Sequence, residues 1–290
     1  MRTIMPTDLA GPVRGLLDAC APLTFAPLPA FGSAPTPGPD DAPEPARRWF
    51  SAEEFAAGEV RAVFDALRAD GNLPPQVQPA AMRYMRSLFR ELVFVVSAGV
   101  YLTGRAVELR PDGVWFPVLA DGATGTPLVA APRVAVLPGG APAGHPDIAA
   151  VVPDEDALDR FAAAGLVATC GPVIEDLARH TRVGVRTLWG YVIDCLHFYM
   201  LNPARRLGRD MTGAWARASR LAAAVIEAGA PRRAMPRMID FPPTVCEGLW
   251  AVRGTCCFDY KADADHGYCV TCPLERDELR RPRLAVAFGS

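Results

Sequence analysis

The sequence predicts an α+β protein that is mostly helical, with a small antiparallel sheet in the middle of the chain and a cysteine segment near the end. Long stretches with apolar residues at helical spacing lie on both sides of residues 105–138. Within that range the pattern changes to short β-prone runs separated by turn residues. Half of the eight cysteines then fall between residues 256 and 272. At 290 residues and 50% hydrophobic composition, the chain can bury a sizeable core, in one large domain or two small ones.

The N-terminal part predicts three helices and one linker. A short amphipathic helix is expected over residues 8–20, followed by an extended surface linker over 26–46, which is dense in proline and glycine. Order is expected to resume at residue 51, where SAEE has the pattern of a capping box that opens a helix to about residue 70. The next helix is predicted over 79–102, with its apolar middle buried.

The middle of the chain predicts the sheet. Two β-prone runs flank Pro111-Asp112-Gly113, which is a hairpin signal, and PLVAAPRVAVLPGG adds one or two further strands. Helical patterns return over 153–180, where acidic residues at the start suit the helix dipole, and Gly171-Pro172 marks an expected break or kink. Two more helices are predicted over 183–200 and 214–229.

Charge and hydropathy exclude several classes of protein. The net charge is −2 and the pI is about 6.1, without the basic stripe expected of a nucleic-acid binder. The first residues lack the features of a secretory signal, and the longest apolar run, 92–102, is shorter than the roughly 20 residues that cross a bilayer. We therefore expect no transmembrane segment and a cytoplasmic location, where thiols stay reduced. There, a group of cysteines indicates a metal or redox site.

The cysteine pattern is Cys256-Cys257-x11-Cys269-x2-Cys272. A C-x-x-C turn places two sulfurs on one metal, and four thiolates complete a zinc site or an iron–sulfur cluster. The doublet is a poor zinc half-site, because neighbouring side chains diverge in an extended chain. A cluster is wider than one ion and accepts thiolates from more divergent directions. Spacing alone leaves zinc, [2Fe–2S] and [4Fe–4S] open.

The same residues resemble a known family. RGTCC, the aromatic Tyr260 and YCVTCPL are similar to the C-terminal signature of the FhuF-type ferric-siderophore reductases. TGRAVELRPDGVWFPVLADG and HTRVGVRTLWGYV resemble family segments more weakly, so the resemblance covers most of the chain from about Trp49. In the family ten residues separate the doublet from C-x-x-C, whereas here there are eleven. The family also commonly has asparagine after LWG, where this chain has Tyr191.

The resemblance implies a [2Fe–2S] cluster on Cys256, Cys257, Cys269 and Cys272, and reduction of Fe(III) held in hydroxamate siderophores. Hydroxamate oxygens are hard donors that hold Fe(III) far more tightly than Fe(II), so one added electron loosens the complex. It further implies a division into an N-terminal helix and linker (1–48), a mixed body that binds the siderophore (49–243) and a cluster-binding segment (244–290).

Electrons are expected to come from an external donor, either a ferredoxin or a flavin-dependent reductase. The chain shows no G-x-G-x-x-G after a strand and no P-loop, so no nucleotide site is predicted. Arg280, Arg281 and Arg283 suggest a docking patch for an acidic donor, but the acidic residues among them favour a solvated helix of mixed charge; these are Glu275, Asp277 and Glu278.

The remaining candidate residues favour simpler interpretations. An apolar collar around the cluster competes with plain packing for four aromatic residues: Trp250, Phe258, Tyr260 and Tyr268. The other cysteines are expected to be small buried residues: Cys20, Cys170, Cys195 and Cys246. Cys195 and His197, two positions apart in a helix, face different directions, so their grouping with Asp194 makes no dyad and core packing is expected. His266 is expected to be a loop residue.

Two other functions stay open beside the reductase. One is a siderophore-handling or interaction protein whose cysteines hold structural zinc, which would be colourless. The other is an iron–sulfur carrier or sensor without reductase activity. Against the carrier, the chain places about 200 residues in a body larger than a carrier needs.

Overall fold

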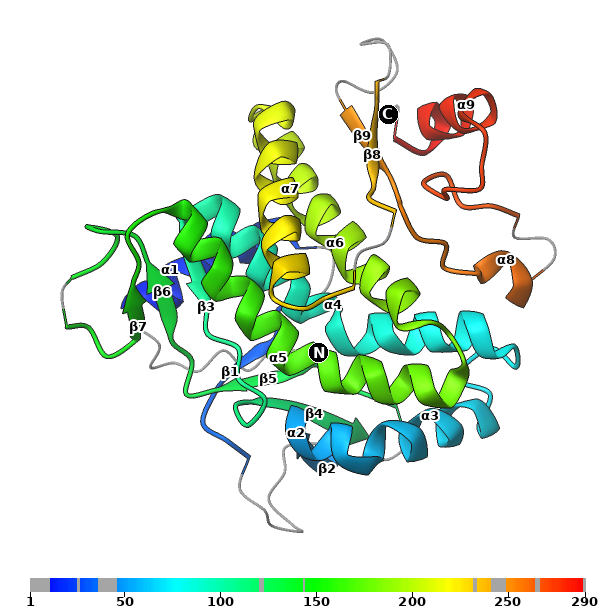
Figure 1. Ribbon diagram of the computed structural model, residues 1–290, viewed down its shortest axis with the longest axis horizontal. Coiled ribbons are helices and arrows are strands. Elements are labelled where there is room, and N and C mark those ends of the chain that lie inside the picture. Colours follow the sequence, from blue (N-terminus) through cyan, green and yellow to red (C-terminus); the bar gives the residue numbers. More distant parts are fainter. Residues whose placement is uncertain are drawn as a thin grey trace.

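Four long helices form the centre of the molecule (Figure 1). The computed structural model describes residues 11–24, 27–35, 46–119, 123–142, 144–231, 234–240, 249–263 and 267–288. The four helices are α4 (Val77–Thr103), α5 (Glu155–Thr181), α6 (Val185–Arg206) and α7 (Met211–Glu227). The protein therefore has the mostly helical α+β architecture that the sequence predicts.

Helix α4 lies at the core of this group. Residues 91–100 are all buried, including Glu91 and Ser97, and the helix packs against α6, α5 and α1 (Gly11–Cys20). Gly99 lets α1 come close, because a Cβ there would meet Leu16 Cδ1 at 2.9 Å. The helix ends at Gly104, whose left-handed backbone favours glycine. The predicted helix over 79–102 is confirmed.

Helix α5 runs through Pro172 as one helix, so the expected break is wrong, while Figure 1 shows the helix changing direction along its length, as the alternative of a kink predicts. Its first turn is capped by Asp154, which accepts a hydrogen bond from the N–H of Ala157 at 2.8 Å. Among the described helices, α5 alone is long and apolar enough to cross a membrane by length and composition, and 56% of its most apolar window is buried inside the molecule. It packs on α7 through the buried ion pair of Arg217 and Asp159.

The capping box before α2 is confirmed. The Glu54 N–H donates to Ser51 Oγ at 3.2 Å, and the Ser51 N–H donates to Glu54 Oε2 at 2.9 Å. The single helix predicted beyond it is divided into α2 (Ala52–Glu54), a π-helical turn (Phe55–Glu59) and α3 (Val60–Ala69). Gly58 is non-helical and makes the kink.

The predicted single antiparallel sheet is wrong, because the strands form two mixed sheets. One has the order β1-β5-β4-β2, and its strands are β1 (Ala30–Gly32), β2 (Ala46–Ser51), β4 (Val114–Leu119) and β5 (Leu128–Ala130). The other has the order β3-β6-β7, and its strands are β3 (Arg105–Val107), β6 (Val134–Val136) and β7 (Ile148–Val151). Each sheet contains one parallel pair, β1 with β5 and β6 with β7. Strands from outside 105–138 complete both sheets.

Two local predictions differ from the structure. The expected hairpin around residues 111–113 does not form, because β3 pairs with β6 while β4 pairs with β2 and β5. The expected surface linker over 26–46 contains β1, and within it Leu28 and Phe31 are buried in the main core. Residues 36–45 lie outside the described part of the chain.

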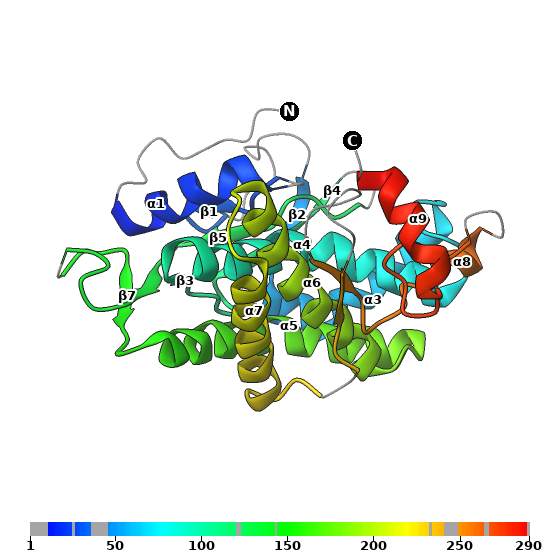
Figure 2. The ribbon, with the colours of Figure 1, turned by 90° about the horizontal axis from the view of Figure 1, so that it is seen from above.

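The cysteine segment lies at one end of the molecule, opposite β7, as Figures 1 and 2 both show. Its elements are β8 (Arg237–Asp240), β9 (Leu249–Val252), α8 (Asp259–Ala262) and α9 (Asp277–Phe288). β8 and β9 pair antiparallel, and with α9 they enclose a small separate core of Ile239, Trp250, Val252 and Leu284.

Candidate metal centre

The backbone ahead of the cysteine doublet is fixed by the helical body. Asp194 of α6 is buried, and its carboxylate accepts hydrogen bonds from the N–H groups of Gly254 at 2.7 Å and Thr255 at 2.9 Å. A Cβ at Gly254 would overlap the carbonyl oxygen of Ala234. The position therefore requires glycine because two stretches of backbone approach closely there.

Helix α8, directly after the doublet, is anchored to α4 on its other side. Arg83 of α4 donates to Asp259 Oδ1 at 2.8 Å, and Lys261 donates to Gln78 Oε1 at 2.6 Å. Phe258, between the doublet and α8, has a left-handed backbone with φ of 60°. Contacts to α6 and α4 thus hold both ends of the segment that carries Cys256 and Cys257.

The C-x-x-C pair lies on a turn joined to the same segment. The N–H of Cys272 donates to the carbonyl of Cys269 at 2.9 Å, which closes the turn. The backbone N–H of Arg253 donates to the carbonyl of Thr271 at 3.0 Å. This bond ties the turn to the strand that leads into the doublet, and so brings the two cysteine pairs together.

The side chain of Arg280 in α9 supports the C-x-x-C turn. This side chain is 0% exposed and donates to three carbonyl oxygens: Val270 at 2.9 Å, Cys272 at 2.7 Å and Glu275 at 2.6 Å. It also pairs with Asp277, which Arg237 of β8 contacts at 2.6 Å. Arg280 is therefore a buried structural residue, and the prediction that placed it in a docking patch or on a solvated helix is wrong.

The four thiols form a hydrogen-bonded chain. Cys257 donates to Cys269, Cys269 donates to Cys272, and Cys272 donates to Cys256. Cys256 and Cys272 are buried, with 6% and 1% exposed, whereas Cys257 and Cys269 are half-buried. The structure thus brings together all four cysteines that the sequence singles out, and two of them border solvent.

Each of the four sulfurs also receives a hydrogen bond from nitrogen. The backbone N–H of Phe258 donates to Cys256 Sγ at 3.3 Å, and backbone N–H groups at residues 259 and 274 donate to Cys257 and Cys272. The guanidinium of Arg253 donates to Cys257 Sγ at 3.4 Å and to Cys269 Sγ. N–H donors and a cation favour thiolate sulfur over neutral thiol.

The hydrogen-bond chain decides which thiol ionises first. The bond donated by Cys272 lowers the pKa of Cys256 to about 7, with the Phe258 N–H acting in the same direction and burial opposing it. The pKa of Cys257 is raised, because its thiol donates to Cys269 and is partly buried. Cys256, which accepts the last of these hydrogen bonds, is therefore the most acidic of the four thiols.

This linear series of hydrogen-bonded thiols differs from a metal site, in which the side chains converge on a single ion. Among the described residues, no group of three or more His, Cys, Asp or Glu side chains is arranged to hold a metal ion. The four thiols lie near one another, paired by hydrogen bonds, without the convergence of a preformed ion site.

The aromatic residues do not form one collar. Tyr260 and Tyr268 pack edge to face, with ring centroids 5.1 Å apart. Phe258 packs against the main core, and Trp250 lies in the small core under the guanidinium of Arg205, 3.8 Å from the ring centroid. Plain packing therefore accounts for Phe258 and Trp250, while the two tyrosines form a separate pair.

The other candidate residues lie where the core interpretation puts them. Cys20, Cys170 and Cys195 are buried, and burial raises the pKa of each thiol, to about 12 for Cys195. His197 is 1% exposed and forms no dyad with Cys195, because its Nδ1 bonds the carbonyl of Ile193 at 2.9 Å. Tyr191 is buried and bonds Cys195. Cys246 and His266 lie outside the described residues.

Sequence reasoning missed the residues that support the thiols: Arg83, Asp194, Arg253 and Arg280. The sequence places Asp194 only beside a possible nucleophile, whereas in the structure its carboxylate accepts a hydrogen bond from the backbone N–H of Gly254, sixty residues later in the chain. Arg253 carried a signal, since it begins the RGTCC motif. Arg280 carried no such signal, because the sequence alone does not distinguish a buried arginine from the exposed arginines beside it.

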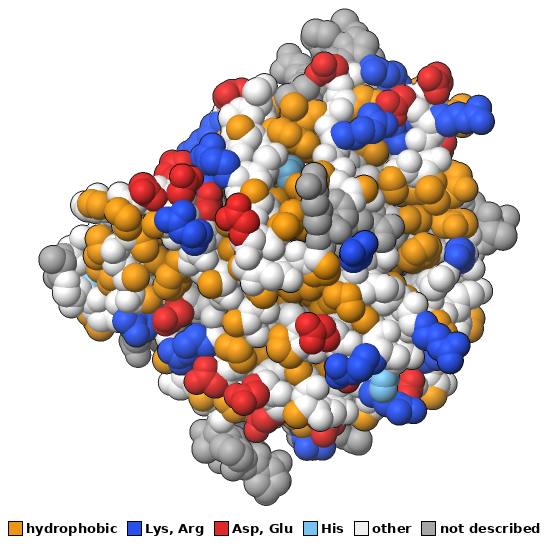
Figure 3. All heavy atoms as spheres, viewed as in Figure 1, with side chains coloured by type: hydrophobic (Ala, Val, Ile, Leu, Met, Phe, Trp, Pro, Cys, Tyr) orange, Lys and Arg blue, Asp and Glu red, His pale blue; other side chains and the backbone are white. Residues whose placement is uncertain are grey.

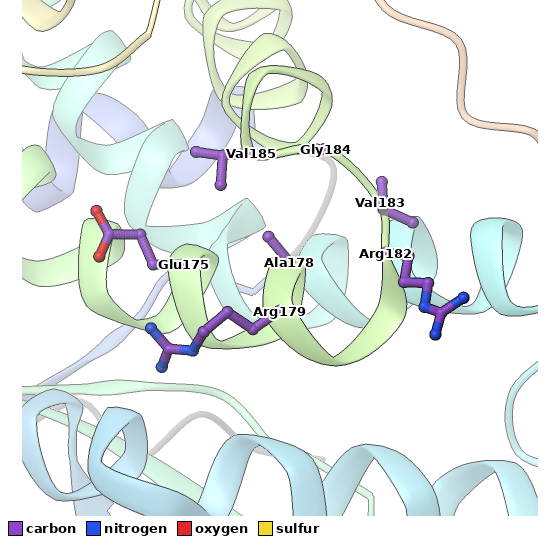
Figure 4. A pocket seen from close by; sticks show the side chains of 7 residues that line it. All are labelled: Glu175, Ala178, Arg179, Arg182, Val183, Gly184 and Val185. Carbon is purple, nitrogen blue, oxygen red and sulfur yellow. The ribbon is translucent and has the colours of Figure 1, made fainter.

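A separate cavity lies at the turn between α5 and α6. It has a volume of about 420 Å³ and is lined by Glu175, Ala178, Arg179, Arg182, Val183, Gly184 and Val185. Figure 4 shows the side chains of Arg179 and Arg182 pointing away from each other. None of the four cysteines, and none of the residues that bond to them, lines this cavity.

No family model matches the chain, and no curated protein matches it either. The site is therefore defined by its own residues, as four thiols from two chain segments that receive N–H and guanidinium donors.

Proposed function

We propose that this protein reduces Fe(III) in hydroxamate-type siderophore complexes to Fe(II), with a [2Fe–2S] cluster bound by Cys256, Cys257, Cys269 and Cys272. The observation that carries the proposal is that four thiols meet in one place and each sulfur receives an N–H or guanidinium donor. Such donors accompany thiolate ligands and tune the reduction potential of iron–sulfur sites.

The four cysteines are better suited to holding an iron–sulfur cluster than to forming a disulfide or packing in an inert core. All seven cysteines in the described part of the chain are free. The guanidinium of Arg253 lies beside two of the four thiols, and Cys256 has a pKa of about 7. Both features favour the loss of thiol protons when a metal group binds. We expect this chemistry in the cytoplasm, where thiols stay reduced and available to hold a cluster. When bound, a [2Fe–2S] cluster supplies one electron at a time.

The chain's own residues have three tasks in this reaction. Asp194, Arg83 and Arg280 hold the cysteine-bearing backbone in place. Arg253 places a positive charge beside Cys257 and Cys269, which offsets the negative charge of thiolates. Cys257 and Cys269 are the half-buried pair, so their side of the site is where a ferric complex has the shortest approach. Fe(III) takes up one electron there, becomes Fe(II), and leaves its weakened hydroxamate ligands.

The first test measures the iron and sulfide content of the purified protein. Protein purified without oxygen should contain about two irons and two acid-labile sulfides per chain, with a visible spectrum that bleaches on reduction. Cys272→Ser should lose that spectrum, whereas Cys170→Ala, in the core, should keep it. The reduced protein should then release Fe(II) from a ferric hydroxamate to a ferrous chelator.

Other results would contradict the proposal. One zinc, no sulfide and no colour would identify a structural zinc segment. A cluster that does not accelerate Fe(II) release would identify a carrier or sensor.

A further inference from the structure

Exposed apolar side chains gather beside the thiol site. Six large hydrophobic residues are strongly exposed in the described part of the chain, and four of them lie between residues 268 and 286. They are Tyr268 (37% exposed), Leu274 (51%), Leu279 (58%) and Val286 (87%). Such a concentration on one short segment indicates a surface that another molecule covers, whereas single exposed apolar residues are ordinary.

Helical spacing puts three of these side chains on one stripe of α9. Leu279, Pro282 and Val286 are exposed and follow one another at intervals of three and four residues. Arg280 and Leu284 are 0% exposed and form the opposite, inward face. Arg283, which is 44% exposed, lies on the same stripe, so the outer face of α9 is mainly apolar with one arginine in it, although the helix already has a buried face. We call Tyr268, Leu274, Leu279, Pro282 and Val286 the α9 patch.

The α9 patch adjoins the C-x-x-C turn. Tyr268 and Leu274 directly flank Cys269–Cys272, and Arg283 of α9 donates to the carbonyl of Tyr268 at 2.7 Å. Arg280 connects the inner face of α9 to the carbonyl of Cys272. A molecule seated on the patch would thus be next to the half-buried Cys269.

The charges around the patch are unequally exposed. Two of the acids are turned inward, since Glu275 is 10% exposed beside Arg283, and Asp277 is 32% exposed between Arg237 and Arg280. The surrounding arginines reach solvent: Arg237 is 52% exposed, Arg283 is 44% exposed, and Arg276 and Arg281 are also exposed. Glu278 is the exposed acid of the first turn of α9. Figure 3 shows Lys and Arg side chains over α9, with some acidic ones among them, beside hydrophobic side chains over α8 and the segment that leads to α9.

We propose that the α9 patch docks an acidic one-electron donor protein, which reduces the cysteine centre. The proposal rests on the proposed function and adds the partner. An apolar centre rimmed by exposed arginines is complementary to an acidic protein surface and would steer its approach. In the step itself, one electron leaves the reduced donor and enters this protein, so the donor is oxidised by one electron and no bond or proton is transferred.

The experiment uses two matched valines. Val286→Glu places an acid in the α9 patch, and Val151→Glu makes the same change at a 61% exposed valine on β7, at the other end of the molecule. Leu279→Glu is a second patch variant. The probe is a reduced plant-type [2Fe–2S] ferredoxin with an acidic surface. Its affinity is measured by calorimetry at low and high salt, and its rate of reducing the protein is measured by stopped flow.

Both patch variants should bind the ferredoxin at least tenfold more weakly than the wild type, and be reduced by it at least tenfold more slowly at subsaturating concentration. Val151→Glu should match the wild type, and salt should weaken wild-type binding. Equal binding by patch variants and wild type, or equal loss in Val151→Glu, would overturn the proposal. So would a patch that mediates only self-association, seen as dimers lost in Val286→Glu while ferredoxin binding is unchanged.

Dithionite separates this proposal from the proposed function. It is a small reductant that needs no docking surface, so it should reduce all variants at the wild-type rate. The reduced variants should then release Fe(II) from a ferric hydroxamate normally. Failure of that release in the wild type would contradict the proposed function, whereas failure of the ferredoxin comparison alone contradicts the docking surface.

Discussion

Two neighbouring arginines on α9 should differ greatly in their effect on the cysteine site. Arg280 is 0% exposed and bonds three carbonyls around the C-x-x-C turn at 2.6–2.9 Å. Arg281 is exposed and donates to the carbonyl of Asp240. Replacing each in turn by methionine keeps most of the side-chain volume and removes the charge. Arg280→Met therefore strips the turn of its support, while Arg281→Met serves as the matched control.

The magnitude follows from the three bonds. A hydrogen bond to a charged group contributes about 1.5–3 kcal/mol, so three at the low end give about 4–5 kcal/mol. The exposed bond that Arg281 donates to the carbonyl of Asp240 contributes about 0.5 kcal/mol or less. Since about 1.4 kcal/mol corresponds to a factor of ten, local opening of the turn should become about a thousandfold more frequent in Arg280→Met.

Hydrogen exchange measured by mass spectrometry reports this opening directly. Peptides that cover residues 268–280 should exchange about a thousandfold faster in Arg280→Met, and within about threefold of the wild type in Arg281→Met. Peptides from α4 should be unchanged in both variants, which shows that the body stays folded. Wild-type protection in Arg280→Met, or equal loss in the two variants, would refute the argument that the buried guanidinium supports the turn.

Three further predictions concern the surroundings of the thiols and the core. Asp194→Asn should lower the free energy of unfolding by about 2 kcal/mol, because each carboxylate oxygen accepts one backbone N–H bond and asparagine keeps only one of the two oxygens. Urea denaturation checks this, and an unchanged midpoint would contradict it. Arg253→Met should lower the midpoint potential of a bound cluster by about 60 mV, which for one electron makes it about tenfold harder to reduce at fixed potential. The reason is that the negative charge added on reduction loses its nearby cation. A redox titration with an unshifted midpoint would argue against this role. Burial lowers the pKa of His197 below its ordinary 6.5, so the unfolded chain binds more protons between the two pKa values and stability is lost as pH falls below about 6.5. His197→Asn should flatten that decline by up to about 1.4 kcal/mol per pH unit, and denaturation midpoints at pH 7.5 and 5.5 that fall equally in both proteins would count against it.

Local signals in the sequence predict much of the fold. Helix positions follow from apolar periodicity, and the capping box at Ser51 satisfies its donors with its own neighbours, so nothing distant is needed. Strand partners depend on distant segments instead. Val107 and Val114 flank an apparent hairpin turn, but β3 and β4 pair with other strands that bury their apolar faces in different sheets.

The same difference applies to the candidate site. The spacing of Cys256, Cys257, Cys269 and Cys272 predicts that they meet, and the structure places all four in one hydrogen-bonded chain. The residues that support these thiols come from elements up to 183 residues away, as with Gln78 and Lys261. Local propensity at Pro172 predicts a break or a kink without deciding between them, and α5 is continuous through this residue.

The two cysteine pairs are held by different parts of the molecule, so a change in one part can release one pair alone. The doublet is anchored to α6 and α4 through Asp194 and Asp259. The C-x-x-C turn depends instead on Arg280 of α9. Loosening α9 would therefore free Cys269 and Cys272 while Cys256 and Cys257 stay in place.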